Sequence, residues 1–171
     1  FTGAVTITTN DNSSPGPVDG TYAADVTIDG GTTQLRIAAS TIDGDLTLRS
    51  GNASGIIDDG TVTVAGDLAA TTNANSGVIN LDTLAVDGTI ALVTDNNGAA
   101  TVVNDAGLNF AASTVGGALS ATATTGNMTQ SGALDIEGTT TLVTAAQGAT
   151  IVLGTSTNAF TGAVTITTND N

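Results

Sequence analysis

One twelve-residue segment occurs twice, without a single difference, in this chain of 171 residues. The segment FTGAVTITTNDN occupies residues 1–12 and again residues 160–171, so the chain repeats with a period of 159 residues. A repeat constrains the fold strongly, because units that recur at a fixed period usually stack on one another. We therefore expect residues 1–159 to form one complete unit and residues 160–171 to begin the next identical unit.

A shorter period runs inside this unit. A small residue followed by apolar residues two and four positions later recurs, beginning at residues 3, 24, 44, 66, 88, 117, 138 and 162. The steps are 21, 20, 22, 22, 29, 21 and 24 residues, which predicts seven coils of about 23 residues per unit. We interpret the long step from Gly88 to Gly117 as an insertion that includes residues 104–107. Residues 13–20 hold both prolines and predict a projecting loop, with Tyr22 packing beside it.

Apolar and polar residues alternate on both sides of the glycines in the best-preserved coils. Val62 and Val64 precede Gly66, and the same spacing precedes Gly88 and Gly138. Alternation places every second side chain on one face of a strand, and glycine permits the backbone to turn a corner. A third apolar stretch follows in most coils. Three short strands and three corners per coil predict an all-β fold, specifically a right-handed parallel β-helix (β-solenoid).

The composition agrees with this fold. The chain contains 34 Thr and 22 Gly, whereas aromatic residues make up only 2%. β-Branched residues interrupted by Gly, Asn and Asp are typical of short strands and tight turns. One coil cannot bury its inward side chains alone, but stacked coils form a continuous core. We therefore expect neighbouring copies of the repeat to stack end to end, with a rise of about 4.8 Å per coil and roughly 34 Å per unit.

The charge excludes several classes of partner. Sixteen acidic residues stand against two arginines and no lysine, for a formal charge of −14. Such a chain cannot neutralise a phosphate backbone or an anionic lipid surface, so we expect no nucleic-acid partner. No apolar run approaches the roughly 18 residues that a membrane span requires, so we expect a chain that is not membrane-spanning.

The residue types that most enzymes use are missing as well. The sequence has no His, no Cys and no Lys, so the usual general bases, thiol nucleophiles and zinc ligands are absent. Pectin-cleaving β-helices use clusters of Asp with Arg or Lys, and Asp58 and Asp59 with Arg49 come nearest to such a cluster. We interpret these residues as a turn and predict that the protein is not an enzyme.

Calcium is the one cofactor for which the sequence offers ligands, because Asp and Asn at turns provide hard oxygen atoms. The candidate ligands are Asp58, Asp59, Asp95, Asn97, Asn104 and Asp105, together with the pair Asp11 and Asp19. Each also fits a purely turn-forming role, so both interpretations stay open.

Rows of Thr-x-Thr, such as Thr139 and Thr141, could bind ice, but they do not recur in every coil and we interpret them as ordinary exposed strand residues.

The run NMTQSGALDIEGTTTLV at residues 127–143 resembles repeats of the filamentous haemagglutinin-like large exoproteins. Residues 129–142 and 158–166 are similar to coils of these giant bacterial surface proteins, and the rest of the chain shares only the coil pattern. The resemblance implies a right-handed β-helix, export to the cell surface, and roles in adhesion or extracellular scaffolding.

Two functions are consistent with these features. The first is a structural repeat module of a giant secreted or surface protein, which forms an extracellular fibre, stalk or sheath that contacts other cells or surface polymers. The second is an adhesin whose loops bind glycans or proteins directly. Glycan sites usually include an aromatic stacking surface, and the single Tyr and three Phe of this chain offer little of one. A glycan array that gives binding dependent on residues 13–20 would favour the second function.

Overall fold

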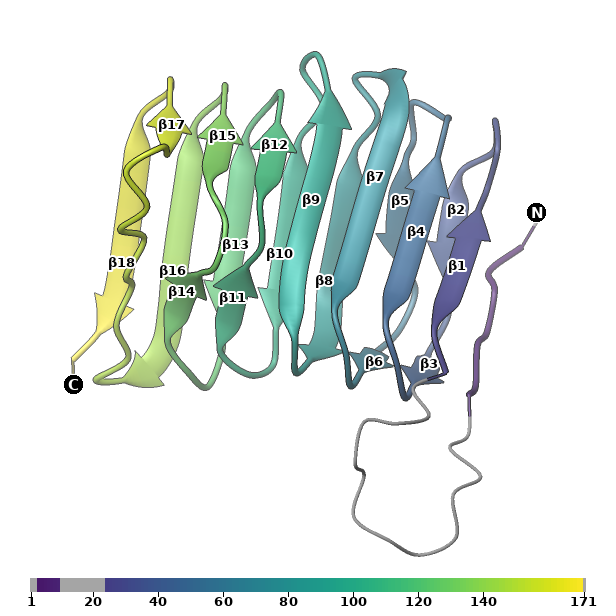
Figure 1. Cartoon of the computed structure of the whole chain (residues 1–171), viewed down its shortest axis with the longest axis horizontal. Coiled ribbons are helices and arrows are strands. Elements are labelled where there is room, and N and C mark those ends of the chain that lie inside the picture. Colours follow the sequence, from purple (N-terminus) through teal and green to yellow (C-terminus); the bar gives the residue numbers. More distant parts are fainter. Residues whose placement is uncertain (1–2, 10–23, 171) are drawn as a thin grey trace, which may run out of the picture.

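The computed structural model describes residues 3–9 and 24–170. The predicted loop at residues 13–20, Tyr22 and the pair Asp11 and Asp19 lie outside this part of the chain. The described residues form eighteen strands and no helix, and so include no helix that could cross a membrane. The strands are parallel and stack into a β-solenoid of about seven turns, which confirms the predicted fold class (Figure 1).

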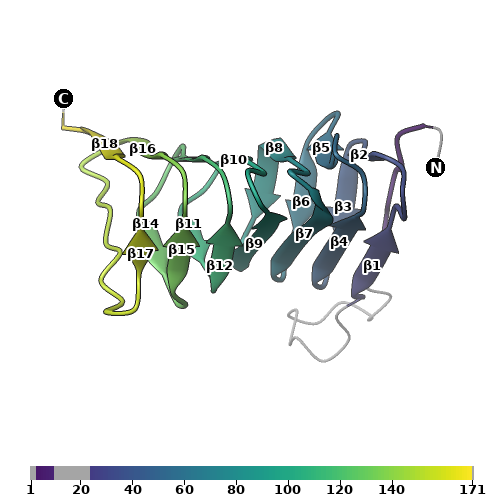
Figure 2. The ribbon, with the colours of Figure 1, turned by 90° about the horizontal axis from the view of Figure 1, so that it is seen from above.

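The strands build two sheets of nine strands each. Sheet A comprises β2 (Leu35–Ile37), β3 (Ser40–Ile42), β5 (Ile56–Asp58), β6 (Val62–Val64), β8 (Ile79–Val86), β10 (Ala100–Asn104), β13 (Leu119–Ala123), β16 (Thr140–Gln147) and β18 (Val164–Asn169). Sheet B comprises β1 (Val26–Asp29), β4 (Leu46–Ser50), β7 (Leu68–Asn75), β9 (Thr89–Asp95), β11 (Leu108–Phe110), β12 (Ser113–Val115), β14 (Met128–Gln130), β15 (Leu134–Ile136) and β17 (Ala159–Phe160). Figure 2 shows the two sheets facing each other along the length of the solenoid.

The predicted third strand of each coil does not build a third sheet. In the first two turns the short strands β3 and β6 extend sheet A, and the unbroken β8 pairs with both β5 and β6. In later turns the break lies in sheet B, where the unbroken β9 pairs with both β11 and β12. The three short stretches seen in the sequence are therefore strands of two sheets, one of which is interrupted by a bend.

The long step from Gly88 to Gly117 is not an insertion, and this corrects the sequence interpretation. Along sheet A, Ile79 pairs with Ala100 and Ala100 pairs with Leu119, so these turns advance by only 21 and 19 residues. Gly88 stacks on Gly66, where the chain passes from sheet A to sheet B, whereas Gly117 stacks on Gly98 at the opposite corner. The same short motif turns both corners, so a step between them measures more than one turn.

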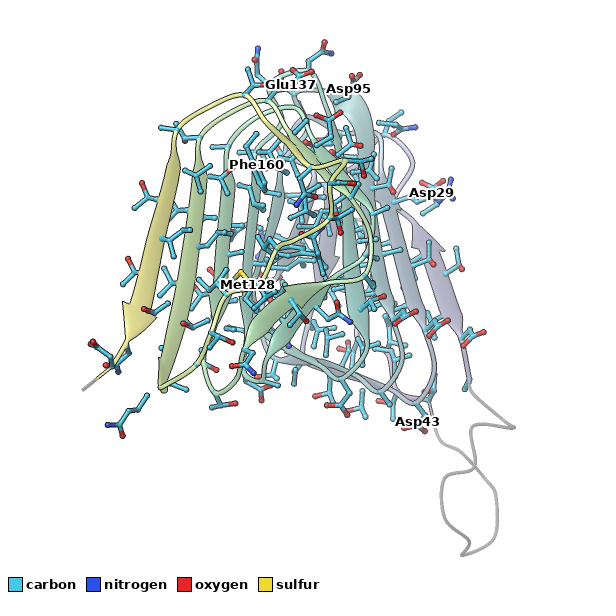
Figure 3. The ribbon with its side chains drawn as sticks, turned by 60° about the vertical axis from the view of Figure 1, so that its left-hand side comes forward. Asp29, Asp43, Asp95, Met128, Glu137 and Phe160 are labelled. Carbon is cyan, nitrogen blue, oxygen red and sulfur yellow. The ribbon has the colours of Figure 1, made fainter. Side chains whose placement is uncertain are left out.

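The core lies between the two sheets and follows directly from the alternation in the sequence. In β4 and β10, and on either side of the exposed pair Asp82 and Thr83 in β8, the buried positions recur at every second residue. Leu46, Leu48, Ile79, Leu81 and Val102 are accordingly 1% exposed or less. Aliphatic side chains stack on aliphatic side chains of the next turn, as Leu46 does on Leu68 and then Ile90. Among the described residues, Phe110 has the largest fully buried side chain. Met128, which is labelled in Figure 3, is also fully buried.

Candidate functional site

A column of aspartates joins successive turns at the corner between sheets A and B. The Asp25 carboxylate accepts the Asp45 N–H at 2.9 Å, and the Asp45 carboxylate accepts the Asp67 N–H at 2.7 Å. The Asp67 carboxylate accepts the Thr89 N–H at 2.6 Å. The column was not predicted from the sequence, although each aspartate follows the small residue of a coil motif, as in Gly44-Asp45-Leu46. These carboxylates thus link consecutive turns through hydrogen bonds to backbone N–H groups.

Glycines form a second column at the opposite corner. Gly117 N–H donates to Gly98 O at 2.9 Å, and Gly138 N–H donates to Gly117 O at 3.0 Å. A Cβ atom on Gly138 would lie 2.6 Å from Ala118 N, and a Cβ on Gly117 or Gly162 would also meet backbone of the previous turn. No side chain fits between turns at this corner, so glycine is needed there for close approach.

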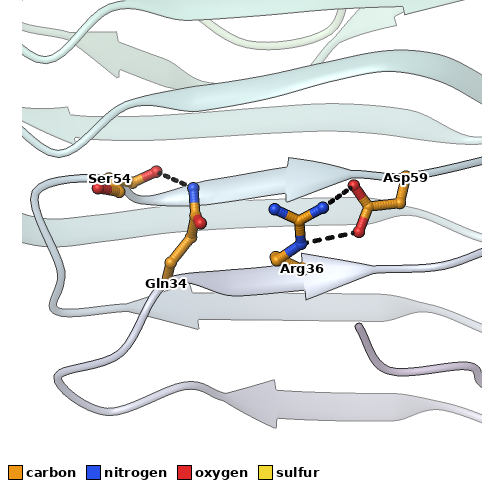
Figure 4. A network of polar contacts seen from close by, with 4 residues as sticks. All are labelled: Gln34, Arg36, Ser54 and Asp59. Carbon is orange, nitrogen blue, oxygen red and sulfur yellow. Dashed lines mark hydrogen bonds and ion pairs between the residues drawn. The ribbon is translucent and has the colours of Figure 1, made fainter. Parts of the chain in front are cut away.

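Asp59 forms an ion pair with Arg36, not with Arg49. The Arg36 guanidinium donates from Nη2 to Asp59 Oδ1 at 2.6 Å and from Nε to Asp59 Oδ2 at 2.9 Å (Figure 4). Arg49 lies on β4 in sheet B, beside Asp29 and Thr71, whereas Asp58 ends β5 in sheet A. The arginine and the aspartates of the nearest enzyme-like cluster are therefore on different sheets.

Asp58 holds the following turn in place. Its Oδ1 accepts the Asp82 N–H at 3.1 Å, and its Oδ2 accepts both the N–H and the hydroxyl of Thr83, at 2.8 and 2.9 Å. The two adjacent calcium candidates thus have different partners. Asp58 accepts hydrogen bonds from backbone N–H groups and a hydroxyl, whereas Asp59 accepts them from a guanidinium.

The remaining calcium candidates lie in two separate turns. The Asp95 carboxylate accepts the N–H of Asn96, which has a left-handed φ of 49°, and Asn97 is exposed in the same turn. Figure 3 places Asp95 at the rim of the solenoid. Asp105 is exposed, and its backbone carbonyl accepts the Thr125 hydroxyl at 2.6 Å. Within residues 3–9 and 24–170, no three acidic side chains gather into a group that could hold a metal ion.

Asn104 differs from the other candidates because its side chain is buried, with 1% exposure. Its Oδ1 accepts the Val86 N–H at 2.8 Å, and its Nδ2 donates to Val86 O and Gly107 O at 2.9 and 2.7 Å. The amide therefore completes the backbone ladder where the chain leaves sheet A.

A shallow pocket lies beside this position. It has a volume of about 240 Å³ and is lined by residues that include Gly88, Gly107, Asn109, Asn127 and Thr129. Ligand pockets usually occupy about 300–1,000 Å³ and combine an apolar lining with a few placed polar groups. This hollow is smaller than that range.

The outward face of sheet A carries a mixed column of side chains. Arg36, Ile57, Asn80, Thr101, Ser120, Thr141 and Thr165 succeed one another in register. Only the last part of this column is rich in hydroxyls, so the described face lacks an uninterrupted threonine array. Of the aromatic residues in the described segments, Phe110 is buried and Phe160 is partly buried against the core.

The free edge of β18 carries two of the four exposed large apolar side chains of the described residues. Val164 and Ile166 are 44% and 58% exposed, although they continue the inward columns of Thr140 and Leu142. Residues 5–9 carry the same sequence and lie at the other end of the same sheet, where Val5 and Ile7 pack against the core. The two identical segments therefore occupy opposite ends of sheet A (Figure 1).

Comparison with known proteins adds a repeat family. Residues 97–167 match the model of a family described as repeats of unknown function (DUF5649). The matched segment contains β10 to β17 and part of β18, and so covers less than half of the chain. No curated protein and no solved structure matches the chain. The second half of the solenoid is thus similar to repeats of a family whose description names no activity.

Proposed function

We propose that this chain is a structural repeat module of a giant secreted or surface protein, which forms an extracellular fibre, stalk or sheath. The observation that carries this proposal is the pair of identical segments at opposite ends of one sheet. A solenoid with this arrangement extends by addition of further units without a change in its core. The match to a family of repeats is consistent with such tandem use.

The chemistry of the chain supports a structural role over a catalytic one. The sequence has no His, Cys or Lys, and the carboxylates of Asp25, Asp45, Asp58 and Asp67 accept backbone hydrogen bonds from neighbouring turns. The hydrogen bonds of these carboxylates hold turns together, which favours a structural role for them. The resemblance to filamentous haemagglutinin-like exoproteins supports export to the cell surface and contact with other cells as part of the same proposal.

Electron microscopy of the native material tests the proposed function. We expect rods on or outside the cell with an axial spacing near 4.8 Å and a layer at roughly 34 Å, which correspond to one turn and to seven stacked turns. Compact particles without an axial repeat, or material confined to the cell interior, would refute the proposal.

A further inference from the structure

The two copies of the twelve-residue segment use different halves of their backbone hydrogen-bonding groups. In the C-terminal copy, Ala163 O accepts the Thr140 N–H at 2.9 Å and Asn169 O accepts the Gly148 N–H at 2.8 Å. Alternate residues of a strand direct their N–H and C=O groups to opposite sides. Residues 163, 165, 167 and 169 therefore face β16, whereas Val164, Ile166 and Thr168 direct theirs toward the free edge.

The N-terminal copy has the opposite side occupied. Val5 N–H donates to Arg36 O at 2.8 Å, and Val5 O accepts the Ala38 N–H at 2.9 Å. Ile7 O accepts the Thr41 N–H at 2.9 Å, while Ile7 N–H donates to Ser40 Oγ at 3.0 Å. Val5 and Ile7 correspond to Val164 and Ile166 in the repeat.

Thr9, which corresponds to Thr168, continues this pattern. Its N–H donates to Thr41 O at 3.0 Å, and its Oγ1 accepts the Asp43 N–H at 2.8 Å. The groups that bind β16 in one copy and the groups that bind residues 36–43 in the other copy are therefore different groups. One segment can make both sets of bonds at the same time.

We propose that the free edge of β18 is the docking site for a second copy of this unit, whose residues 36–43 pair with it in the register that residues 5–9 display. Val164 then lies opposite Ile37 of the following copy, and Thr167 lies opposite its Thr41, as Val5 and Thr8 do here. This inference deepens the proposed function and rests on its premise that units follow one another. It makes residues 164–168, the counterparts of residues 5–9, a strand shared between two units, not a cap on either.

Burial of apolar groups supports the same occupant. The inward side chains of the N-terminal copy, Val5 and Ile7, pack against the core that begins with Leu35 and Ile37. Their counterparts Val164 and Ile166 lie over Thr140 and Leu142 on one side and are open on the other. In the register that residues 5–9 display, a second copy would place its Ile37 over Val164 and its Ser40 over Ile166, so that the core continues without a gap.

A chain of two units tests the proposal. It consists of residues 1–159 followed directly by residues 1–171, and its amide hydrogen exchange is compared with that of the 171-residue chain. We expect the amides of Val164, Ile166 and Thr168 to gain protection of at least about 100-fold, since they pass from a free edge into a ladder. The amides of Thr165 and Thr167 serve as the internal control, because β16 already binds their side of the strand.

Engineered disulfides test the register. The natural sequence contains no cysteine, so an introduced pair forms without competition. In the two-unit chain, Thr167→Cys with Thr41→Cys in the second unit should oxidise quickly, because neighbouring strands about 4.8 Å apart suit a disulfide. Thr165→Cys with the same Thr41→Cys is the matched control and should oxidise slowly.

The possible results separate the two proposals. Unchanged exchange at Val164, Ile166 and Thr168 would overturn the docking site, and faster oxidation of the control pair would overturn the register. Protected amides together with a failure to find rods in native material would leave the junction in place and reject the extracellular fibre. Rods in native material, together with unprotected amides at the junction, would support the extracellular fibre and reject the docking site.

Discussion

Buried polar side chains of this solenoid lie among stacked aliphatic residues, and nearly all have a partner on the backbone. Ser113, for example, donates to Ala111 O and accepts the Leu92 N–H. Within the described residues, Thr140 Oγ1 and Asn109 Oδ1 are buried without a hydrogen bond. Thr140 occupies an inward position between Leu119 and Val164, in a column that is otherwise apolar in these turns.

Thr140→Val should therefore stabilise the protein. The substitution keeps the shape of the side chain and removes an unpaired buried hydroxyl, which costs about 1 kcal/mol or more. We expect the free energy of unfolding in urea to rise by about 1 kcal/mol. The matched control is Thr94→Val, since Thr94 Oγ1 donates to Gly98 O and accepts the Gly116 N–H. That variant should lose about 2 kcal/mol, and equal effects at the two positions would contradict the assignment.

The aspartate column predicts a second effect. Asp45→Ala removes an acceptor from the Asp67 N–H, and we expect a loss of about 1 kcal/mol in stability. Asp45→Asn should recover most of this loss, because an amide oxygen also accepts a hydrogen bond. Asp135→Ala on the exposed face of β15 controls for the change in net charge and should stay within about 0.5 kcal/mol of the parent. Chemical denaturation of the four proteins makes the comparison.

Calcium should not contribute to stability through the described candidates. The Asp58, Asp59, Asp95 and Asn104 side chains already have hydrogen-bond or ion-pair partners within the chain. We expect the melting temperature to be the same in millimolar calcium and in excess chelator. A rise of several degrees with calcium, abolished by Asp58→Asn or Asp95→Asn, would establish a site.

At the scale of the element, the corners set the spacing between turns more strictly than the strands do. Strands tolerate irregularities, as the register shift between Thr71 and Asn75 shows. At the corner of Gly98, Gly117 and Gly138, in contrast, consecutive backbones hydrogen-bond directly and leave no room for a side chain.

Gly138→Ala should consequently destabilise the solenoid. The added Cβ would lie 2.6 Å from Ala118 N, and relief of that contact must move one turn away from the next. Overpacking of this kind typically costs about 1–3 kcal/mol. Gly154→Ala is the control, because its Cβ would meet nothing within 4 Å. If both variants unfold at the same denaturant concentration, the corner does not fix the spacing.

At the scale of the whole molecule, stability depends on how many units stack. In a solenoid it is approximately the sum of the stabilities of the units and of the interfaces between them. The exposed apolar edge of β18 lacks one such interface in a single unit, and it gains one where another unit follows.

The cost of Ile166→Ala should therefore depend on chain length. In the 171-residue chain Ile166 is 58% exposed, and we expect a loss below about 1 kcal/mol. In the two-unit chain Ile166 of the first unit lies at the junction. Its substitution by alanine should lower the free energy of unfolding by about 2–4 kcal/mol, as substitutions of buried isoleucines do. Thermal or chemical unfolding of the four proteins measures the difference. Equal costs in both chains would show that the edge stays exposed.

The sequence by itself determined the type of fold and most of its core. Alternation is a local property, so the inward positions of Leu46, Leu48, Leu81 and Val86 follow from the residues alone. The spacing of the coil motif likewise predicted a stack of about seven turns. The exact repeat at residues 1–12 and 160–171 indicated that units could follow one another.

The tertiary structure alone decided which residues meet between turns. Gly88 and Gly117 have the same local motif but turn opposite corners, and only strand pairing distinguishes them. Asp59 meets Arg36, and Asp25 meets the Asp45 N–H, because the turns differ in length, from 19 residues between Ala100 and Leu119 to 32 residues between Val5 and Ile37. A difference of one residue in the length of a turn changes which side chains are adjacent in consecutive turns. The local sequence does not determine that length, because it depends on which strands pair.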